Sequence, residues 1–391
     1  MNQEFRNWPE FSQEEVDAVG RVLGSGQVNY WTGNEGREFE REFAKSCNAA
    51  YAVALSNGTV ALELALRALG IGPRDEVVVT PRTFIASVSA IVMVGATPIF
   101  ADIDTVSQNI TVNTVSSVLT ERTRAIIAVH LAGWPCDMDG LMALANARGL
   151  FVIEDCAQSH GAMYKGKPVG GLGHVAAWSF CQDKIMTTGG EGGMVTTNDR
   201  ALWSRMWSYK DHGKSWGAVY EREHPPGFRW LHDSLGTNLR MMEIQAAIGR
   251  IQLKRMSDWH GRRKANAEVI LEVCRQFPIV LRVPMLSEII EHAWYKCYVF
   301  VRPEGLMEGW GRDRIMGEIN LLGVPCFSGT CSEVYLEKAF DNTVWRPKER
   351  LPVAKELGET SLMFLVHPTL TQDEISKTVE VIQQVMSLAS K

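Results

Sequence analysis

Residues 51–70 read YAVALSNGTVALELALRALG, and this stretch decides the class of the fold. The apolar run YAVAL predicts a strand, SNG predicts a turn, and TVALELALRALG predicts a helix that ends at Gly70. The same order returns along the chain up to about residue 198, with further strands predicted in DEVVVTP, TPIFADI, RAIIAVHLAG and GLFVIEDC. Strands that alternate with helices favour a mainly parallel sheet covered by helices, so we expect an α/β fold.

The pattern changes after about residue 250. A long helical stretch begins at MMEIQAAIG and leads into the strand-like WYKCYVFVR, the helical RDRIMGEINLLG and a final amphipathic helix. A chain of 391 residues suits one large and one smaller domain. We therefore predict a large domain in residues 1–250 and a small C-terminal α/β domain in residues 251–391.

Composition excludes several classes of partner. The formal net charge is −5 and no basic block is present, which argues against nucleic acid. The longest apolar stretch, near Ile91 to Ala101, is too short to span a bilayer. The eight cysteines form no CxxC pair, so we expect no metal site, and the scattered thiols together with the lack of a signal peptide predict a cytoplasmic protein.

Two charged side chains follow predicted strands. In SFCQDKIMTTGGEGGMV, Lys184 lies between an apolar strand and a glycine-rich bend, where a partly desolvated lysine can act as a nucleophile. The alternative is a solvated lysine beside a hairpin. In FVIEDCAQSHGA, Glu154 and Asp155 must point to opposite faces of a strand, and an ionised Asp155 can pair with a protonated pyridine nitrogen. The alternative is that Asp155 caps the next helix.

Two further segments suit a flat, phosphorylated ligand. In SNGT, Gly58 and Thr59 open a helix, and a helix N-terminus binds phosphate through its free N–H groups. The alternative is an ordinary N-cap. Phe84 follows the strand VVVTP, where its ring can stack on a cofactor or belong to the core. Together these segments provide a phosphate site, a stacking ring, an acid and a lysine.

At this point the sequence resembles the DegT-type (DegT/StrS) sugar aminotransferases, which are pyridoxal 5′-phosphate (PLP) enzymes of fold type I. The resemblance covers most of the chain and rests on YWTGNEGREFEREFA, SNGT, TPRTF, EDCAQSHGA, SFCQDKIMTTGGEGG and GTNLRMMEIQAAIG. It implies that Lys184 holds PLP as a Schiff base and moves protons. It also implies that Asp155 binds the ring nitrogen, that Phe84 stacks on the ring and that Gln158 binds the 3′ oxygen. In the same way it implies that the phosphate is held by Gly58, Thr59 and Ser179, and that Asn238 reaches the neighbouring subunit's phosphate.

The resemblance implies a homodimer with shared active sites that moves an amino group from glutamate to a keto or aldehydo sugar. The product would serve surface polysaccharide or lipopolysaccharide biosynthesis. A PLP-dependent sugar dehydratase is a second hypothesis, although relatives that dehydrate sugars carry histidine where this chain keeps Lys184. A PLP-binding scaffold without turnover is a third, and the intact lysine, aspartate and glutamine argue against it.

The sugar is the least determined part of this prediction. A nucleotide-linked hexose is the common substrate of the family, but GVPCFSGTCSEVYLEKAF (residues 323–340) departs from the relatives' Tyr-x-Pro pattern on the nucleotide side. The alternative is a free sugar acid, the 8-oxo octulosonate that yields 8-amino-3,8-dideoxy-manno-octulosonate. Its carboxylate would need a cation, for which Arg82, Arg229 and Arg240 are candidates.

Overall fold

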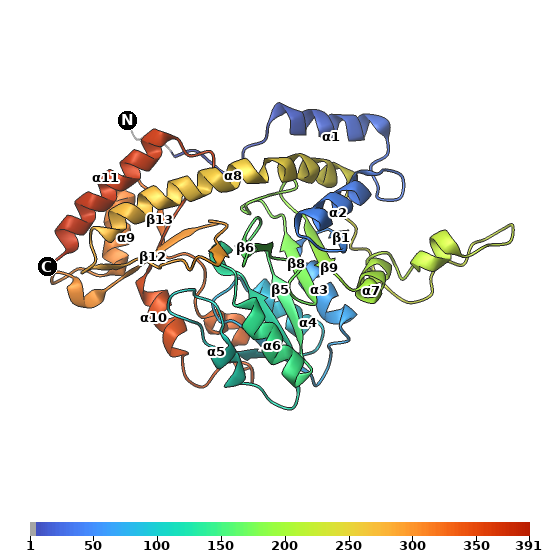
Figure 1. Ribbon diagram of the computed structural model, residues 1–391, viewed down its shortest axis with the longest axis horizontal. Helices are drawn as coiled ribbons and strands as arrows, with labels where there is room; N and C mark the ends of the chain where they lie inside the picture. Colours follow the sequence, from blue (N-terminus) through green and yellow to red (C-terminus); the bar gives the residue numbers. More distant parts are fainter. Residues whose placement is uncertain (1–4) are drawn as a thin grey trace.

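The computed structural model describes residues 5–391, and a seven-stranded sheet lies at its centre (Figure 1). Strand β9 is antiparallel to both neighbours, while the other strands share one direction, so the expected α/β fold is confirmed with a mixed, mainly parallel sheet. The strand order is β1 (Tyr51–Leu55), β9 (Gly193–Thr197), β8 (Val175–Ser179), β5 (Phe151–Asp155), β4 (Thr123–Val129), β2 (Glu76–Val79) and β3 (Thr97–Phe100).

Helices cover both faces of this sheet because its strands are apolar on both sides. Val77 and Val79 pack in one core cluster with α3, α4 and α7, whereas Val78 packs on the other face with α5 and α6. This alternation is the strand geometry that makes a three-layer core. The helices of this part are α1 (Gln13–Ser25), α2 (Glu35–Ser46), α3 (Gly58–Ala68), α4 (Ala86–Met93), α5 (Val112–Ser116), α6 (Met138–Arg148) and α7 (Arg200–Lys210).

The long helix α8 (Glu243–Arg275) runs across the molecule from α1 and α2 to α11 (Figure 1). The predicted domain boundary at residue 250 falls inside this helix, and the division into two domains stays a prediction. Beyond α8, a four-stranded antiparallel sheet packs with the last helices. These elements are β10 (Leu281–Arg282), β12 (Cys297–Val301), β14 (Ser361–Phe364), β13 (Cys326–Phe327), α9 (Arg312–Leu321), α10 (Pro352–Thr360) and α11 (Gln372–Ala389).

The two sheets are joined beside the carboxyl ends of the parallel strands. Strand β11 (Ile290–Glu291) pairs with β6 (Met163–Tyr164), which pairs in turn with β7 (Lys167–Pro168). The N–H groups of Ala293 and Tyr295 donate to the carbonyls of Gly133 and Ala132. These bonds hold the start of β12 against the loop that follows β4.

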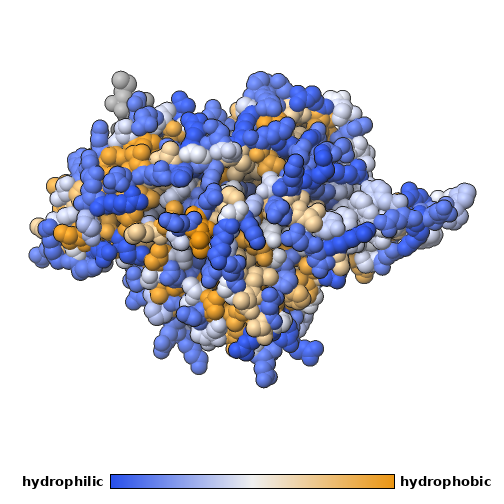
Figure 2. All heavy atoms as spheres, in the orientation of Figure 1, coloured by the Kyte–Doolittle hydropathy of each residue, from blue (hydrophilic) through white to orange (hydrophobic). Residues whose placement is uncertain are grey.

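Residues 212–237 form an arm whose tip stands away from the body, while Trp216 and Val219 near its base pack on the core beside α7 (Figures 1 and 2). A backbone bridge between Asp211 and Asn238 closes its base. The arm exposes Phe228, Trp230 and Leu235, whose exposed fractions are 75%, 77% and 93%. In residues 5–391, no helix combines the length and the apolar content that a membrane crossing requires.

Candidate active site

A cavity of about 570 Å³ lies where β1, β2, β4, β5 and β8 end. Ligands of open α/β sheets bind at this edge, beyond the carboxyl ends of the strands. Tyr295 and Lys296 from the start of β12 and the segment around Thr330 line its other wall. The predicted site residues that line this cavity are Gly58, Thr59, Phe84, Asp155, Gln158, Ser179 and Lys184.

The first turn of α3 forms one end of the cavity. The Asn57 side chain accepts a hydrogen bond of 3.0 Å from the N–H of Val60, so the N-cap interpretation of SNGT is correct, and phosphate binding stays a prediction. The N–H groups of Gly58 and Thr59 precede any intrahelical partner and remain available to an anion. A Cβ on Gly58 would lie 2.6 Å from the Cβ of Ser179. Only glycine therefore lets the helix end approach Ser179 so closely.

Asp155 is buried at the end of β5 and points into the cavity. Its Oδ2 accepts from the Ser87 hydroxyl at 2.7 Å, and its Oδ1 accepts from the N–H of Ala157 at 3.1 Å. Burial raises the pKa of Asp155, and these hydrogen bonds and nearby Lys184 only partly oppose the rise. A cationic ligand group beside this carboxylate would favour its ionised form.

Glu154 faces away from Asp155, as the alternation along a strand requires. It contacts the Nε2 of His130 at 3.1 Å and accepts from the N–H groups of Gly170, Leu172 and Gly173. Burial alone would raise the pKa of Glu154, but these partners together lower it. Glu154 thus anchors the loop between β7 and β8 and does not reach the cavity.

Gln158 and Phe84 line the cavity on either side of Asp155. The Oε1 of Gln158 accepts from the N–H of Ala132 at 2.8 Å, which leaves the amide nitrogen to donate to a ligand. Phe84 is 65% exposed, so it is not the core phenylalanine that the sequence also allowed. His160, which follows the same strand, lies between Trp178 and Phe180 outside the cavity, and burial lowers its pKa to about 3.

Lys184 lies between the cavity and the N-terminal segment. Only 14% of its side chain is exposed, and its Nζ is 3.5 Å from Oδ1 of Asp183. Its carbonyl accepts from the indole N–H of Trp8 at 2.7 Å. The hydroxyl of Tyr295 donates to Oδ2 of Asp183. Burial would raise the pKa of Asp183, but the combined effect of Lys184, Tyr295 and Lys296 is larger, so the pKa is lowered.

Sequence reasoning missed several residues of this site. Asp183 adjoins Lys184 within the quoted segment SFCQDKIMTTGGEGGMV, and Ser87 follows Phe84 by three positions. Tyr295 and Lys296 arrive from β12, more than a hundred positions away, and no local pattern marks them.

Four predicted residues lie outside the cavity. Arg82 is fully buried, donates to Gln108 and Ser361 at 3.0 and 3.2 Å, and lies over the Tyr298 ring. Arg240 pairs with the buried Asp211 at 2.7 Å. The two remaining residues belong to the arm and its base: Arg229 is exposed and donates to the carbonyl of Val219, and Asn238 is exposed beside Arg240.

The substrate role of the three arginines stays a prediction, and the contacts that Arg82 and Arg240 make within the chain do not favour it. Arg82 has no exposed atom to offer, because its guanidinium holds the segment after β2 to β14. Arg240 is occupied by Asp211, which also accepts from the indole of Trp31 at 2.6 Å. Arg229 projects with the arm, away from the cavity of its own chain.

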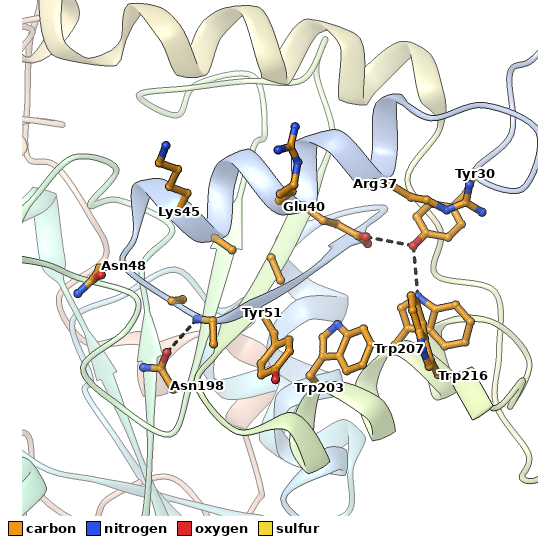
Figure 3. Close-up of a pocket in the computed structure, with 15 residues that line it drawn as sticks. Tyr30, Arg37, Glu40, Lys45, Asn48, Tyr51, Asn198, Trp203, Trp207 and Trp216 are labelled. Atoms are coloured by element: carbon orange, nitrogen blue, oxygen red, sulfur yellow. Dashed lines mark hydrogen bonds between the residues drawn. The ribbon is translucent and has the colours of Figure 1, made fainter. Parts of the chain in front are cut away.

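A second cavity, of about 740 Å³, lies between α2, β1 and α7 and contains none of the predicted residues (Figure 3). Three tryptophans from α7 and the loop after it, Trp203, Trp207 and Trp216, form one side. Tyr30 is satisfied within this cavity, since it donates to Glu40 at 3.0 Å and accepts from Trp207 at 3.2 Å (Figure 3). We therefore place the chemistry in the first cavity.

The residues of the first cavity fit PLP. The close approach of Gly58 to Ser179 leaves a helix N-terminus and a hydroxyl side by side, which suits a phosphate, and Asp155 is a buried acid whose pKa is raised by burial. Lys184 lies in the same cavity with most of its side chain shielded from water. A phosphate, a protonated ring nitrogen and an aldehyde are the three groups that such a set of residues suits.

Comparisons with known proteins agree with this chemistry. A model described as the DegT/DnrJ/EryC1/StrS aminotransferase family matches residues 9–383. GDP-perosamine synthase of Escherichia coli O157:H7 is 35% identical over 97% of both chains. The spore coat polysaccharide biosynthesis protein SpsC of Bacillus subtilis is 33% identical over 97% of this chain and 96% of its own. The dTDP-3-amino-3,4,6-trideoxy-alpha-D-glucose transaminase of Streptomyces venezuelae is 34% identical over 96% and 93%.

Solved structures are similar over the whole chain. An aminotransferase from Psychrobacter cryohalolentis is 63% identical, with a TM-score of 0.97 over 98% of this chain and 99% of the other. The PLP form of a sugar aminotransferase from Streptococcus pneumoniae is 25% identical, with a TM-score of 0.86 over 99% of each chain.

Proposed function

Since the chain belongs to the DegT/DnrJ/EryC1/StrS aminotransferase family and is a PLP-dependent sugar aminotransferase, we propose that it transfers the amino group of glutamate to a nucleotide-linked keto or aldehydo sugar. One observation carries the proposal: a single cavity contains Lys184, the buried Asp155 and the cradle of Gly58 and Ser179.

Each residue has a distinct task in this proposal. When bound, PLP supplies an electron sink for the reacting carbon. Asp155 holds a proton on the ring nitrogen, and Ser87 orients its carboxylate from α4. Lys184 attaches the cofactor and then moves a proton at the reacting carbon with its Nζ. Asp183, 3.5 Å from that nitrogen, stabilises its protonated form.

Binding and orientation of the cofactor fall to the remaining residues. Gly58, Thr59 and Ser179 bind the phosphate through N–H and hydroxyl groups. Gln158 donates its free amide hydrogen to the 3′ oxygen, because its Oε1 is already held by Ala132. Phe84 covers one face of the ring, which excludes water from the reacting side.

The names of the relatives support a nucleotide-linked acceptor. One makes GDP-perosamine, another is a dTDP-sugar transaminase, and SpsC is named for spore coat polysaccharide biosynthesis. We propose that the product of this enzyme is likewise an amino sugar for a surface polysaccharide or lipopolysaccharide, made in the cytoplasm.

A free sugar acid is the second candidate acceptor. Gly329, Thr330, Cys331, Val334 and Glu337 line the cavity, and they belong to the segment that departs from the family pattern. A changed wall at this position favours a changed substrate, such as the 8-oxo octulosonate. Protection from heat by UDP, GDP or dTDP would favour the nucleotide sugar, and amination of the octulosonate without any nucleotide effect would favour the acid.

We also propose a homodimer with shared active sites. The arm exposes Phe228, Trp230 and Leu235, three large side chains that water solvates poorly. Asn238 and Arg229 lie at its base and along it, outside the cavity of their own chain. Both residues are thereby free to reach the cavity of a second copy, with Asn238 directed to the phosphate.

The glutamate half-reaction tests the main proposal. The holoenzyme, mixed with glutamate but no sugar, should convert the absorbance of bound PLP to that of pyridoxamine phosphate. The Lys184→Ala variant should lose both this conversion and the cofactor that borohydride otherwise fixes to the chain. Lys264→Ala is the matched control, since Lys264 is exposed on α8. A wild-type enzyme that leaves glutamate unchanged would refute glutamate as the donor.

A further inference from the structure

The charges around the cavity are unbalanced. Of the described residues, two cations line it, Lys184 and Lys296, together with four acids, Asp155, Asp183, Glu191 and Glu337. Lys184 is committed to the cofactor and is already paired with Asp183. An anionic substrate that enters this cavity therefore meets mostly negative side chains, and within one chain Lys296 is the cation left to offset them.

Lys296 is held on a rigid support. The N–H of Tyr295 donates to Ala132 and that of Trp294 donates to Nδ1 of His292, so the chain before Lys296 is fixed at two points. Cys297 then begins β12 with its side chain buried. Strand alternation puts Lys296 and Tyr298 on the opposite face, and the Tyr298 hydroxyl accepts from the N–H of Thr330 in the cavity wall.

The Lys296 ammonium lines the same cavity as Lys184 and forms no ion pair among residues 5–391, although its charge helps to lower the pKa of Asp183. Its Nζ is 5.0 Å from the centroid of the Tyr295 ring, and the Nζ of Lys184 is 5.4 Å from the same centroid. The two lysines thus lie beside one aromatic ring, and both line the same cavity. A substrate that reacts at Lys184 therefore lies within reach of Lys296.

We propose that Lys296 binds an anionic group of the acceptor sugar inside this cavity. The group is the diphosphate of a nucleotide sugar or the carboxylate of a sugar acid, which present the same charged oxygens to an ammonium. This inference rests on the proposed aminotransferase function and names the residue that selects its acceptor. Lys296 thereby takes the role of substrate cation that we predicted for Arg82 and Arg240, whose side chains bond to Ser361 and Asp211 within the chain.

The test uses holoenzyme of the wild type, Lys296→Gln, Lys296→Arg and the matched control Lys264→Gln. Calorimetric titrations with dTDP, UDP, GDP and 3-deoxy-manno-octulosonate give the dissociation constants. The glutamate half-reaction of each variant is followed by absorbance. Lys296→Gln should weaken the binding of the best probe by about tenfold or more, because a charge-assisted bond is lost. Lys296→Arg should retain most of the binding, and Lys264→Gln should bind as the wild type does.

Each arm gives a distinct answer. A loss confined to the nucleoside diphosphates identifies a phosphate, and a loss confined to the octulosonate identifies a carboxylate. The inference is overturned if the wild type binds none of these probes, or if Lys296→Gln binds them unchanged. It is also overturned if the glutamate half-reaction falls as far as the probe affinity. Failure of the proposed function is separate, because it shows as a wild-type enzyme that does not convert with glutamate.

Discussion

Replacing Gly58 with alanine places one methyl group where the structure has no room for it. The new Cβ would lie 2.6 Å from the Cβ of Ser179 and 3.0 Å from its Cα and Oγ. Carbon atoms in good contact are about 3.5–4.0 Å apart, so α3 and the end of β8 must separate by roughly 1 Å. Both sides of that gap belong to the proposed phosphate cradle, and the displacement therefore acts on cofactor binding directly.

The magnitude follows from the cost of overpacking. An extra methylene group in a well-packed site costs about 1–3 kcal/mol. If this cost appears when the cradle closes on the phosphate, the dissociation constant of PLP rises about 5- to 150-fold, since 1.4 kcal/mol corresponds to about tenfold. Alanine favours a helix over glycine by about 1 kcal/mol at most, so the helix itself is not weakened by the change.

The assay is a titration of the apoenzyme with PLP, followed by absorbance. Gly20→Ala is the matched control, because Gly20 lies in α1 and a Cβ there meets no atom within 4 Å. Thermal melting of each apoenzyme distinguishes a variant that is unfolded from one that is folded but binds PLP weakly. A Gly58→Ala enzyme that folds and binds PLP as tightly as the wild type would refute the cradle, and with it the placement of the phosphate.

Two other predictions test the acid and the shared site. Asp155→Asn should abolish nearly all turnover while most PLP stays bound. The reason is that an amide loses a charge-assisted hydrogen bond of about 1.5–3 kcal/mol and cannot hold the ring proton. If turnover of this variant, measured with saturating glutamate and acceptor, equals that of the wild type, this role for Asp155 is rejected. Mixing the inactive variants Lys184→Ala and Asn238→Asp should restore part of the activity through hybrid dimers, and a fully active monomer in sedimentation would contradict shared sites.

The cofactor end of the site was predictable because each of its parts is local. The turn SNGT carries its own cap, since Asn57 bonds to Val60 three positions later. The two-residue period of a strand was enough to predict that Asp155 and Glu154 face opposite sides of the sheet. In the structure, Glu154 accepts from the N–H groups of Gly170 and Leu172. The α/β class was predicted from the local alternation of strands and helices. The antiparallel direction of β9 depends on the bend after Lys184 and on pairing with β1, and the alternation pattern does not encode either of them.

The sequence alone could not show which of the candidate arginines are already occupied by contacts within the chain. Charge and a nearby strand end made Arg82 a candidate, but its partner Ser361 lies 279 positions away and belongs to β14. Arg240 is occupied by Asp211, 29 positions before it, at the base of an arm that has no repeating pattern. An arginine that is buried or paired with a carboxylate is less available to bind a substrate. Both conditions depend on long-range contacts, which a local sequence pattern does not show.

This difference between local motifs and long-range contacts explains why the sequence predicts the cofactor more clearly than the sugar. The residues proposed to contact the cofactor come from loops that follow β1, β2, β5 and β8, so the central sheet alone brings them together. The opposite wall comes from the start of β12 and from residues 329–337, whose position depends on how the second sheet packs against the loop after β4. Changes in that wall leave the cradle and Asp155 untouched. A family built in this way can exchange its acceptor while it keeps its chemistry, and in this chain the exchangeable wall carries Lys296.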